Sequence, residues 1–173
     1  MQEQIFTATR RVPQFREMSW LKLKRAVLVS ADAEGGTKLN AFDNALLKAG
    51  IGNANLVKLS SVVPPDIEWL SEPPSFPLGS VIFAVLSHIE SDAHGKKISA
   101  AVGVGLCGST EGGLIYEFSG ECDGEEAMET VKRMVEEGFA VRNWKLSELK
   151  IAVAEHSVGE RAGCALAGVV FFP

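Results

Sequence analysis

The order of predicted elements favours an α+β fold built as a layered sandwich. A strand and a helix come first, several strands follow, and a second helix and two strands complete the chain. Most strand connections look like hairpin turns, whereas a doubly wound parallel sheet needs a helix between successive strands. The 173 residues suffice for one domain of ordinary size, so we expect a single domain over residues 1–173.

The composition excludes several classes of protein. With 17 Lys and Arg against 22 Asp and Glu, the net charge is −5 and no basic block is present, which argues against binding to nucleic acids or anionic membranes. No apolar stretch is long enough to span a bilayer, and the N-terminus lacks the pattern of a signal peptide. Three widely spaced cysteines without a CxxC pair predict no zinc site and favour the reducing cytoplasm.

The first half of the chain contains one predicted helix. Residues 26–29 form a short apolar strand, and the polar run over residues 30–36 indicates a loop. Residues 40–49 follow as the helix, with Asn40 as its N-cap and Gly50 in position to end it. We interpret the residues before the first strand, 1–24, as an N-terminal arm.

The second half is mostly strands. Residues 66–78 hold three prolines and predict an extended connector. Asp123 caps the clearest helix, and Gly138 is predicted to end it. The expected strands of this half are 81–89, 98–106, 114–118, 149–155 and 164–172.

A serine pair, Ser60-Ser61, ends the strand predicted over residues 55–60, just before two valines and two prolines. A hydroxyl at a strained peptide bond can attack the preceding carbonyl, and elimination from the resulting ester followed by hydrolysis leaves a pyruvoyl group. Asn55, one strand length upstream, could polarise that carbonyl. The alternative interpretation is an ordinary polar turn before the prolines.

Four segments together resemble the pyruvoyl-dependent arginine decarboxylases. The likeness runs in consistent order over residues 25–172. Its main motifs are Leu39-Asn-Ala-Phe-Asp43, Ala49-Gly-Ile-Gly-Asn53, Ser60-Ser61-Val-Val-Pro64-Pro65 and Gly113-Leu-Ile-Tyr-Glu117.

The resemblance implies an αββα sandwich that works as a homotrimer with active sites between subunits. The proenzyme would cut itself between Ser60 and Ser61. The products would be a β chain of residues 1–60, of which 25–60 follow the arm, and an α chain of residues 61–173. Ser61 would become the pyruvoyl cofactor, with neither pyridoxal phosphate nor a metal, and the pyruvoyl ketone would accept the electrons released by decarboxylation.

The same resemblance assigns roles to individual side chains in the conversion of L-arginine to agmatine and carbon dioxide. Asn55 would assist self-cleavage, and Glu117 would be the proton donor. Asp43 would hold the guanidinium of the substrate, and Leu39 and Leu46 would shape the pocket around its aliphatic part.

Alternatives remain for the function and for single residues. The same pyruvoyl chemistry could act on another amino acid, or the chain could be an unprocessed, non-catalytic oligomeric binding domain. Asp43, at the third position of the predicted helix, could simply satisfy the helix N-terminus. Glu117 could lie on a solvated face of its strand, and we interpret His156 as a structural residue.

Overall fold

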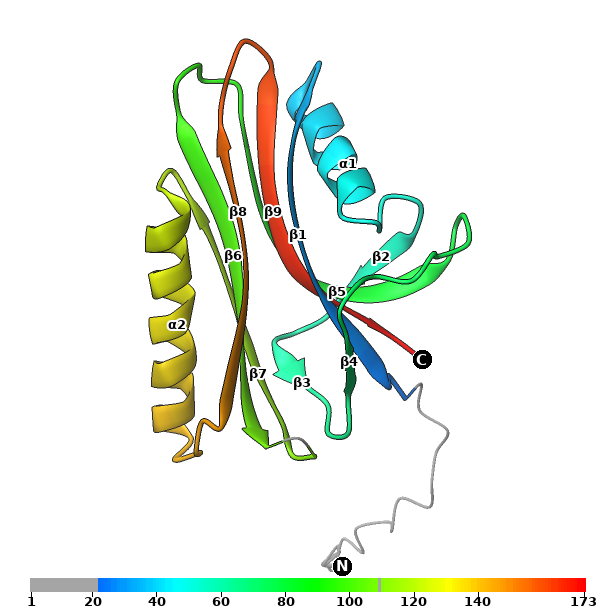
Figure 1. Cartoon of the computed structure of the whole chain (residues 1–173), viewed down its shortest axis with the longest axis vertical. Coiled ribbons are helices and arrows are strands. Elements are labelled where there is room, and N and C mark those ends of the chain that lie inside the picture. Colours follow the sequence, from blue (N-terminus) through cyan, green and yellow to red (C-terminus); the bar gives the residue numbers. More distant parts are fainter. Residues whose placement is uncertain (1–21, 109) are drawn as a thin grey trace, which may run out of the picture.

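The computed structural model describes residues 22–108 and 110–173, so most of the predicted arm, residues 1–21, lies outside the described residues (Figure 1). Within them the fold is α+β, with two helices and two sheets, as predicted. The elements are β1 Arg25–Gly35, α1 Lys38–Lys48, β2 Asn55–Lys58, β3 Val62–Val63, β4 Glu68–Leu70, β5 Val81–Ser91, β6 Lys97–Gly108, β7 Gly112–Gly120, α2 Gly124–Val141, β8 Glu148–Ser157 and β9 Ala162–Phe172.

The strands form two sheets that we call sheet A and sheet B. Sheet A has five strands in the order β2-β5-β9-β1-β4, and sheet B has four in the order β3-β7-β6-β8. The long strands pair antiparallel, while the short β2 and β4 run parallel to their neighbours β5 and β1. Among the described residues, however, β6 and β7 are the consecutive long strands that pair as a hairpin. The connections β5–β6 and β8–β9 pass from one sheet to the other, so the expectation that most connections are hairpins is wrong.

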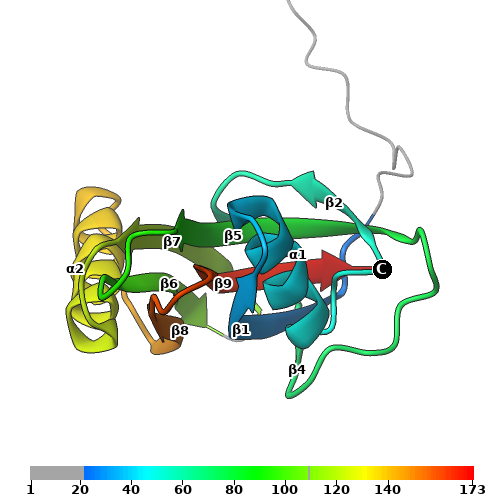
Figure 2. The same cartoon turned by 90° about the horizontal axis from the view of Figure 1, so that it is seen from above.

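Three groups of apolar contacts hold the elements together. One core joins the facing sides of the two sheets and includes Val85, Val102 and Phe171. Helix α1 packs on the other side of sheet A through Ala41 and Ala45, and α2 packs on sheet B through residues of its apolar stripe. Viewed from above, α2 lies on one side of β6, β7 and β8, and α1 lies on their other side (Figure 2).

The first helix begins earlier than predicted. Thr37, not Asn40, is the N-cap, because the Thr37 hydroxyl accepts the Asn40 N–H at 3.1 Å. Asp43 therefore lies beyond the first turn, which contains no acidic residue. The interpretation of Asp43 as a residue that satisfies the helix N-terminus is wrong.

Helix α2 starts after Asp123, as predicted, but continues past Gly138 to Val141. Gly138 lies inside the helix, at the point where the ring of Tyr116 from β7 packs against it. A Cβ at position 138 would lie 1.9 Å from the Tyr116 Oη. The glycine therefore makes room for a neighbouring strand and does not end the helix.

Two further expectations need correction. The polar run predicted as a loop over residues 30–36 continues strand β1 as far as Gly35, which pairs with Ala162 of β9. Its polar residues alternate with buried ones such as Ala31, as on a strand with one solvated face. The predicted connector contains the short strand β4, and β2 ends at Lys58, two residues before the predicted end at Ser60.

Candidate active site

The serine pair lies where the chain passes from sheet A to sheet B. Leu59 still pairs with sheet A, since its N–H donates to the Ala84 carbonyl at 2.9 Å. Two residues after Ser60, β3 begins and pairs with β7 of sheet B. Ser60 and Ser61 therefore bridge the two sheets, between the edge strands β2 and β3.

Ser61 is held by β7 through its side chain and its backbone. Its hydroxyl donates to Glu117 Oε2 at 3.2 Å, and its carbonyl accepts the Ile115 N–H at 3.0 Å. Neighbouring side chains on a strand point to opposite faces. Ile115 belongs to the core between the sheets, so Glu117, two residues on, faces the same side. Glu117 is half-buried and is not on a solvated face.

Strand β7 is also tied to sheet A beside this contact. The buried hydroxyl of Ser87 from β5 donates to the Phe118 carbonyl at 2.5 Å. This bond crosses between the sheets next to Glu117 and fixes the strand that carries the carboxylate. Sequence reasoning missed Ser87, because a serine inside a long apolar run gives no signal of its partner.

Three predicted substrate residues share one stripe of α1. Leu39, Asp43 and Leu46 are spaced by four and three residues, which places them on one face of a helix. Leu39 is 74% exposed and Asp43 is exposed, whereas Leu46 packs partly against sheet A. A carboxylate between two leucines on an exposed stripe offers a charged end and an apolar wall to a ligand.

This stripe and the Ser61–Glu117 pair lie on different parts of the chain. Helix α1 packs on β1, β9 and β5, whereas Ser61 is held by β7. Asn55 is also apart from the serines, at the start of β2, where its side-chain amide donates to the Gly79 carbonyl at 2.9 Å. The structure of one chain thus brings Ser61 and Glu117 together and leaves Asn55, Asp43, Leu39 and Leu46 elsewhere.

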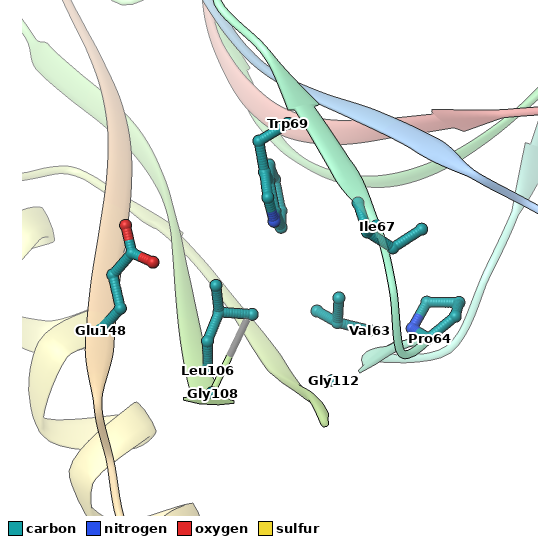
Figure 3. Close-up of a pocket in the computed structure, with 8 residues that line it drawn as sticks. All are labelled: Val63, Pro64, Ile67, Trp69, Leu106, Gly108, Gly112 and Glu148. Atoms are coloured by element: carbon teal, nitrogen blue, oxygen red, sulfur yellow. The ribbon is translucent and has the colours of Figure 1, made fainter. Parts of the chain in front are cut away.

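A separate pocket of about 80 Å³ lies at one end of the two sheets (Figure 3). Ile67, just before β4, and Trp69 of β4 face Leu106 across it, and Glu148 of β8 lies at its side. Lys150 pairs with Glu148 at 2.5 Å and lies 5.6 Å from the Trp69 ring centre. The pocket carboxylate is therefore paired with a lysine, and none of the predicted site residues lines the pocket.

Comparison with known proteins decides the family. A family model described as pyruvoyl-dependent arginine decarboxylase matches residues 25–173. The chain is 61% identical over 157 residues to the pyruvoyl-dependent arginine decarboxylase of Pyrococcus furiosus, an alignment that covers 90% of this chain and 99% of that relative. It is 41% identical over 161 residues to the enzyme of the same name from Methanocaldococcus jannaschii, covering 89% and 93% of the two chains.

The chain belongs to the pyruvoyl-dependent arginine decarboxylase family. The resemblance carried by the sequence motifs is thereby confirmed, and with it the class of enzyme and the pyruvoyl cofactor. The surroundings of Ser61 are compatible with a pyruvoyl group formed from that residue. Its carbonyl is anchored on β7, and a carboxylate lies beside its side chain.

Two findings bear on the remaining sequence interpretations. In the part of the chain that the structure describes, no helix is long and apolar enough to cross a membrane. The ring of His156 is 10% exposed and its Nδ1 lies 3.0 Å from Asp32 Oδ2, which ties β8 to β1, as expected of a structural residue.

Proposed function

We propose that this chain cuts itself between Ser60 and Ser61 and then decarboxylates L-arginine to agmatine and carbon dioxide. The observation that carries the proposal is the Ser61–Glu117 hydrogen bond at the crossover between the sheets, in a chain of this family. It places a nucleophilic hydroxyl beside a carboxylate at the bond to be cut. Nucleophile and base within hydrogen-bond reach are the usual sign of an activated nucleophile.

Self-cleavage follows from this arrangement. Glu117 takes the proton as the Ser61 Oγ attacks the Ser60 carbonyl carbon. The proton passes to the Ser61 nitrogen as the peptide C–N bond breaks, which leaves an ester between Ser60 and the Ser61 side chain and a free amine at Ser61. Loss of the Ser61 α-proton then breaks the Cβ–Oγ bond, which releases the Ser60 carboxylate and leaves dehydroalanine at position 61. Tautomerisation to the imine and addition of one water release ammonia and leave the pyruvoyl group. Overall, one water is consumed and one ammonia is released.

In decarboxylation, the pyruvoyl group supplies the electron sink for the bond that breaks. The residues of this chain position that chemistry. The Ile115 N–H holds the carbonyl of residue 61 on β7, and Glu117 is placed to return a proton to the α-carbon of the substrate. The exposed Asp43 would bind the guanidinium by two parallel hydrogen bonds, with Leu39 and Leu46 along the aliphatic chain.

The working unit that we propose is a homotrimer of cleaved αββα sandwiches with active sites between subunits. The sequence of contacts, α1 on sheet A, sheet A on sheet B, and α2 on sheet B, supports the four layers. Because Asp43 and Asn55 lie apart from Ser61 in one chain, a site that uses all of them needs a second copy. The 87% exposed side chain of Leu78, which precedes the Gly79 that is bonded to Asn55, supports such a contact.

The remaining proposals concern the boundaries of the chain and its compartment. The single domain would comprise residues 1–173, with residues 1–24 as an arm before the family match, which begins at residue 25. A β chain of residues 1–60 would then carry β1, α1 and β2, and the α chain of residues 61–173 would carry the other elements. We place the protein in the cytoplasm, which the three unpaired cysteines favour.

Intact mass under denaturing conditions tests the proposal. We expect two chains, one ending at Ser60 and one starting at residue 61, the second lighter by one ammonia than a chain with a serine terminus. Ser61→Ala removes the nucleophile and should remain one chain. Ser60→Ala keeps the nucleophile and the carbonyl, so it should still be cut.

Activity assays separate the alternatives. An uncut, stable full-length chain would favour the non-catalytic binding domain. Cleavage with equal activity on arginine and on a neutral amino acid would favour the same chemistry on another substrate. Cleavage with carbon dioxide release from arginine alone supports the proposal.

A further inference from the structure

The scissile bond lies inside a tight turn. The Val62 N–H donates to the Ser60 carbonyl oxygen at 2.8 Å, which closes a three-residue turn with Ser61 at its centre. The carbonyl that self-cleavage must attack therefore already carries a hydrogen-bond donor. Its donor belongs to the backbone of the second residue along the chain.

Contacts on both sides of the turn keep it in place. On one side, Leu59 remains paired with Ala84 of sheet A. On the other, β3 pairs with β7 through Val62 opposite Leu114, and the Ser61 carbonyl accepts the Ile115 N–H. The two serines connect a strand of sheet A to a strand of sheet B, and the turn makes this connection.

We propose that the Val62 N–H is an oxyanion donor for self-cleavage, an inference that rests on the proposed function. When Ser61 Oγ adds to the Ser60 carbonyl carbon, negative charge develops on the carbonyl oxygen. A donor already aimed at that oxygen stabilises the charge as it forms and needs no rearrangement. The Val62 nitrogen keeps its proton throughout, so the step stays balanced as written above.

This role is separate from the side chains already assigned. Glu117 acts on the Ser61 hydroxyl, not on the Ser60 oxygen. The amide of Asn55 is bonded to Gly79 in this chain, so Val62 supplies the donor that the structure places on the scissile carbonyl. The Val62 side chain is 59% exposed, so the effect comes from its N–H and not from packing of the side chain.

The test exchanges one backbone atom. Val62 is replaced by its α-hydroxy analogue, which keeps the side chain and puts an ester oxygen in place of the N–H. The same exchange at Val63 is the matched control, and Val62→Ala controls for the side chain. Cleavage is followed by intact mass against time in samples whose circular dichroism and oligomer size match the unsubstituted chain.

We expect self-cleavage at Ser60–Ser61 to slow by about 10²–10³-fold in the Val62 ester, the loss typical of one oxyanion donor. The Val63 ester and Val62→Ala should keep rates within about threefold. Hydroxylamine cuts the ester intermediate between Ser60 and the Ser61 side chain wherever that intermediate accumulates. In the variant with the backbone ester at Val62, the acyl shift that forms the intermediate is itself slow, so hydroxylamine should not restore cleavage at Ser60. Hydroxylamine can also cut the introduced backbone ester between residues 61 and 62. This cleavage gives fragments that end at Ser61, which are counted separately.

The outcomes separate the two proposals. If the unsubstituted chain is never cut, the proposed function fails. If it is cut and the folded Val62 ester is cut as fast, only the oxyanion role of Val62 is overturned. Val62→Pro also removes the N–H and can be made by ordinary mutagenesis, so its cleavage rate is a second test of the role. Normal cleavage of that variant would overturn the role as well.

Discussion

The hydroxyl of Ser61 lies 3.2 Å from Glu117 Oε2, although 56 residues separate the two. The pairing of β3 with β7 closes that separation, because Val62 lies opposite Leu114 and the next residues along β7 bring Glu117 beside the serine. In the mechanism that we propose, this one carboxylate acts in self-cleavage and again in decarboxylation. Changing Glu117 should therefore affect both reactions.

Glu117→Gln tests this dual role. The amide keeps the shape of the side chain but cannot take or return a proton. We expect slower self-cleavage and, in the fraction that is cut, a kcat for arginine lower by about 10²-fold or more, with a smaller change in KM. Cleavage by intact mass and release of carbon dioxide measure the two effects.

Glu121→Gln is the matched control, since Glu121 follows the same strand but is exposed and pairs with Lys96. It should leave both rates close to those of the unsubstituted chain. Unchanged rates in Glu117→Gln would remove Glu117 from the mechanism.

Asp43→Asn tests the guanidinium contact. Asp43 is exposed and lies beyond the first turn of α1, so its loss should leave the thermal unfolding midpoint nearly unchanged. The loss of a charge-assisted bidentate contact should lower kcat/KM for arginine about 10–100-fold. Glu129→Gln, an exposed helix carboxylate paired with Lys132, is the control. A normal kcat/KM in Asp43→Asn would show that another group binds the substrate.

The parts of the fold that sequence predicted are those with long, local patterns. Both helices, the long strands and the cap at Asp123 follow from periodicity and from residues adjacent in the chain. The two-residue strand β3 has no such pattern, and its pairing partner is fifty residues away. The cap at Thr37 was missed because Asn40, three residues later, is an equally good capping residue by type.

For the candidate site too, some features could be predicted from the sequence and others could not. The serine pair and the residues of α1 could be named from motifs, whereas their relative positions could not. The hydrogen bond of Ser87 to Phe118 and that of Val62 to Ser60 use backbone atoms, which every residue has and no motif marks. Such contacts depend on how the sheets meet and appear only in three dimensions.

Gly138→Ala sets two effects of opposite sign against each other. Helix propensity alone would stabilise the variant by about 1 kcal/mol. A new Cβ would, however, meet the Tyr116 ring, whose Cζ lies 2.6 Å from that position. We expect a net loss of about 1–3 kcal/mol in the free energy of unfolding, because overpacking against a ring costs more than propensity returns.

Tyr116→Leu supplies the control through a double-mutant cycle measured by denaturant unfolding. With the ring removed, Gly138→Ala should become neutral or stabilising, and the coupling between the two sites should be large. A stabilised single Gly138→Ala variant would mean that the ring moves away at little cost.

The acid sensitivity of the fold should depend in part on Asp32, which joins β1 to α1 and β8. Lys48 Nζ lies 2.6 Å from Asp32 Oδ1, and His156 Nδ1 lies 3.0 Å from Asp32 Oδ2. Partial burial works to raise the pKa of Asp32, but the hydrogen bonds from Lys48 and His156 outweigh it and hold that pKa below its ordinary value of 3.8.

A carboxyl whose pKa is lower in the folded state stabilises the fold fully above its unfolded value. The stabilisation is then lost as the pH falls from 3.8 through the lowered folded pKa. Asp32→Asn should therefore flatten the decline of the unfolding midpoint across that window. Since 38% of the Asp32 side chain is exposed, we expect an effect below about 1 kcal/mol. Asp92, which pairs with Lys38, is more exposed than Asp32, so Asp92→Asn should change the decline less. Equal declines in Asp32→Asn and the unsubstituted chain would show that these contacts do not favour the charged carboxylate.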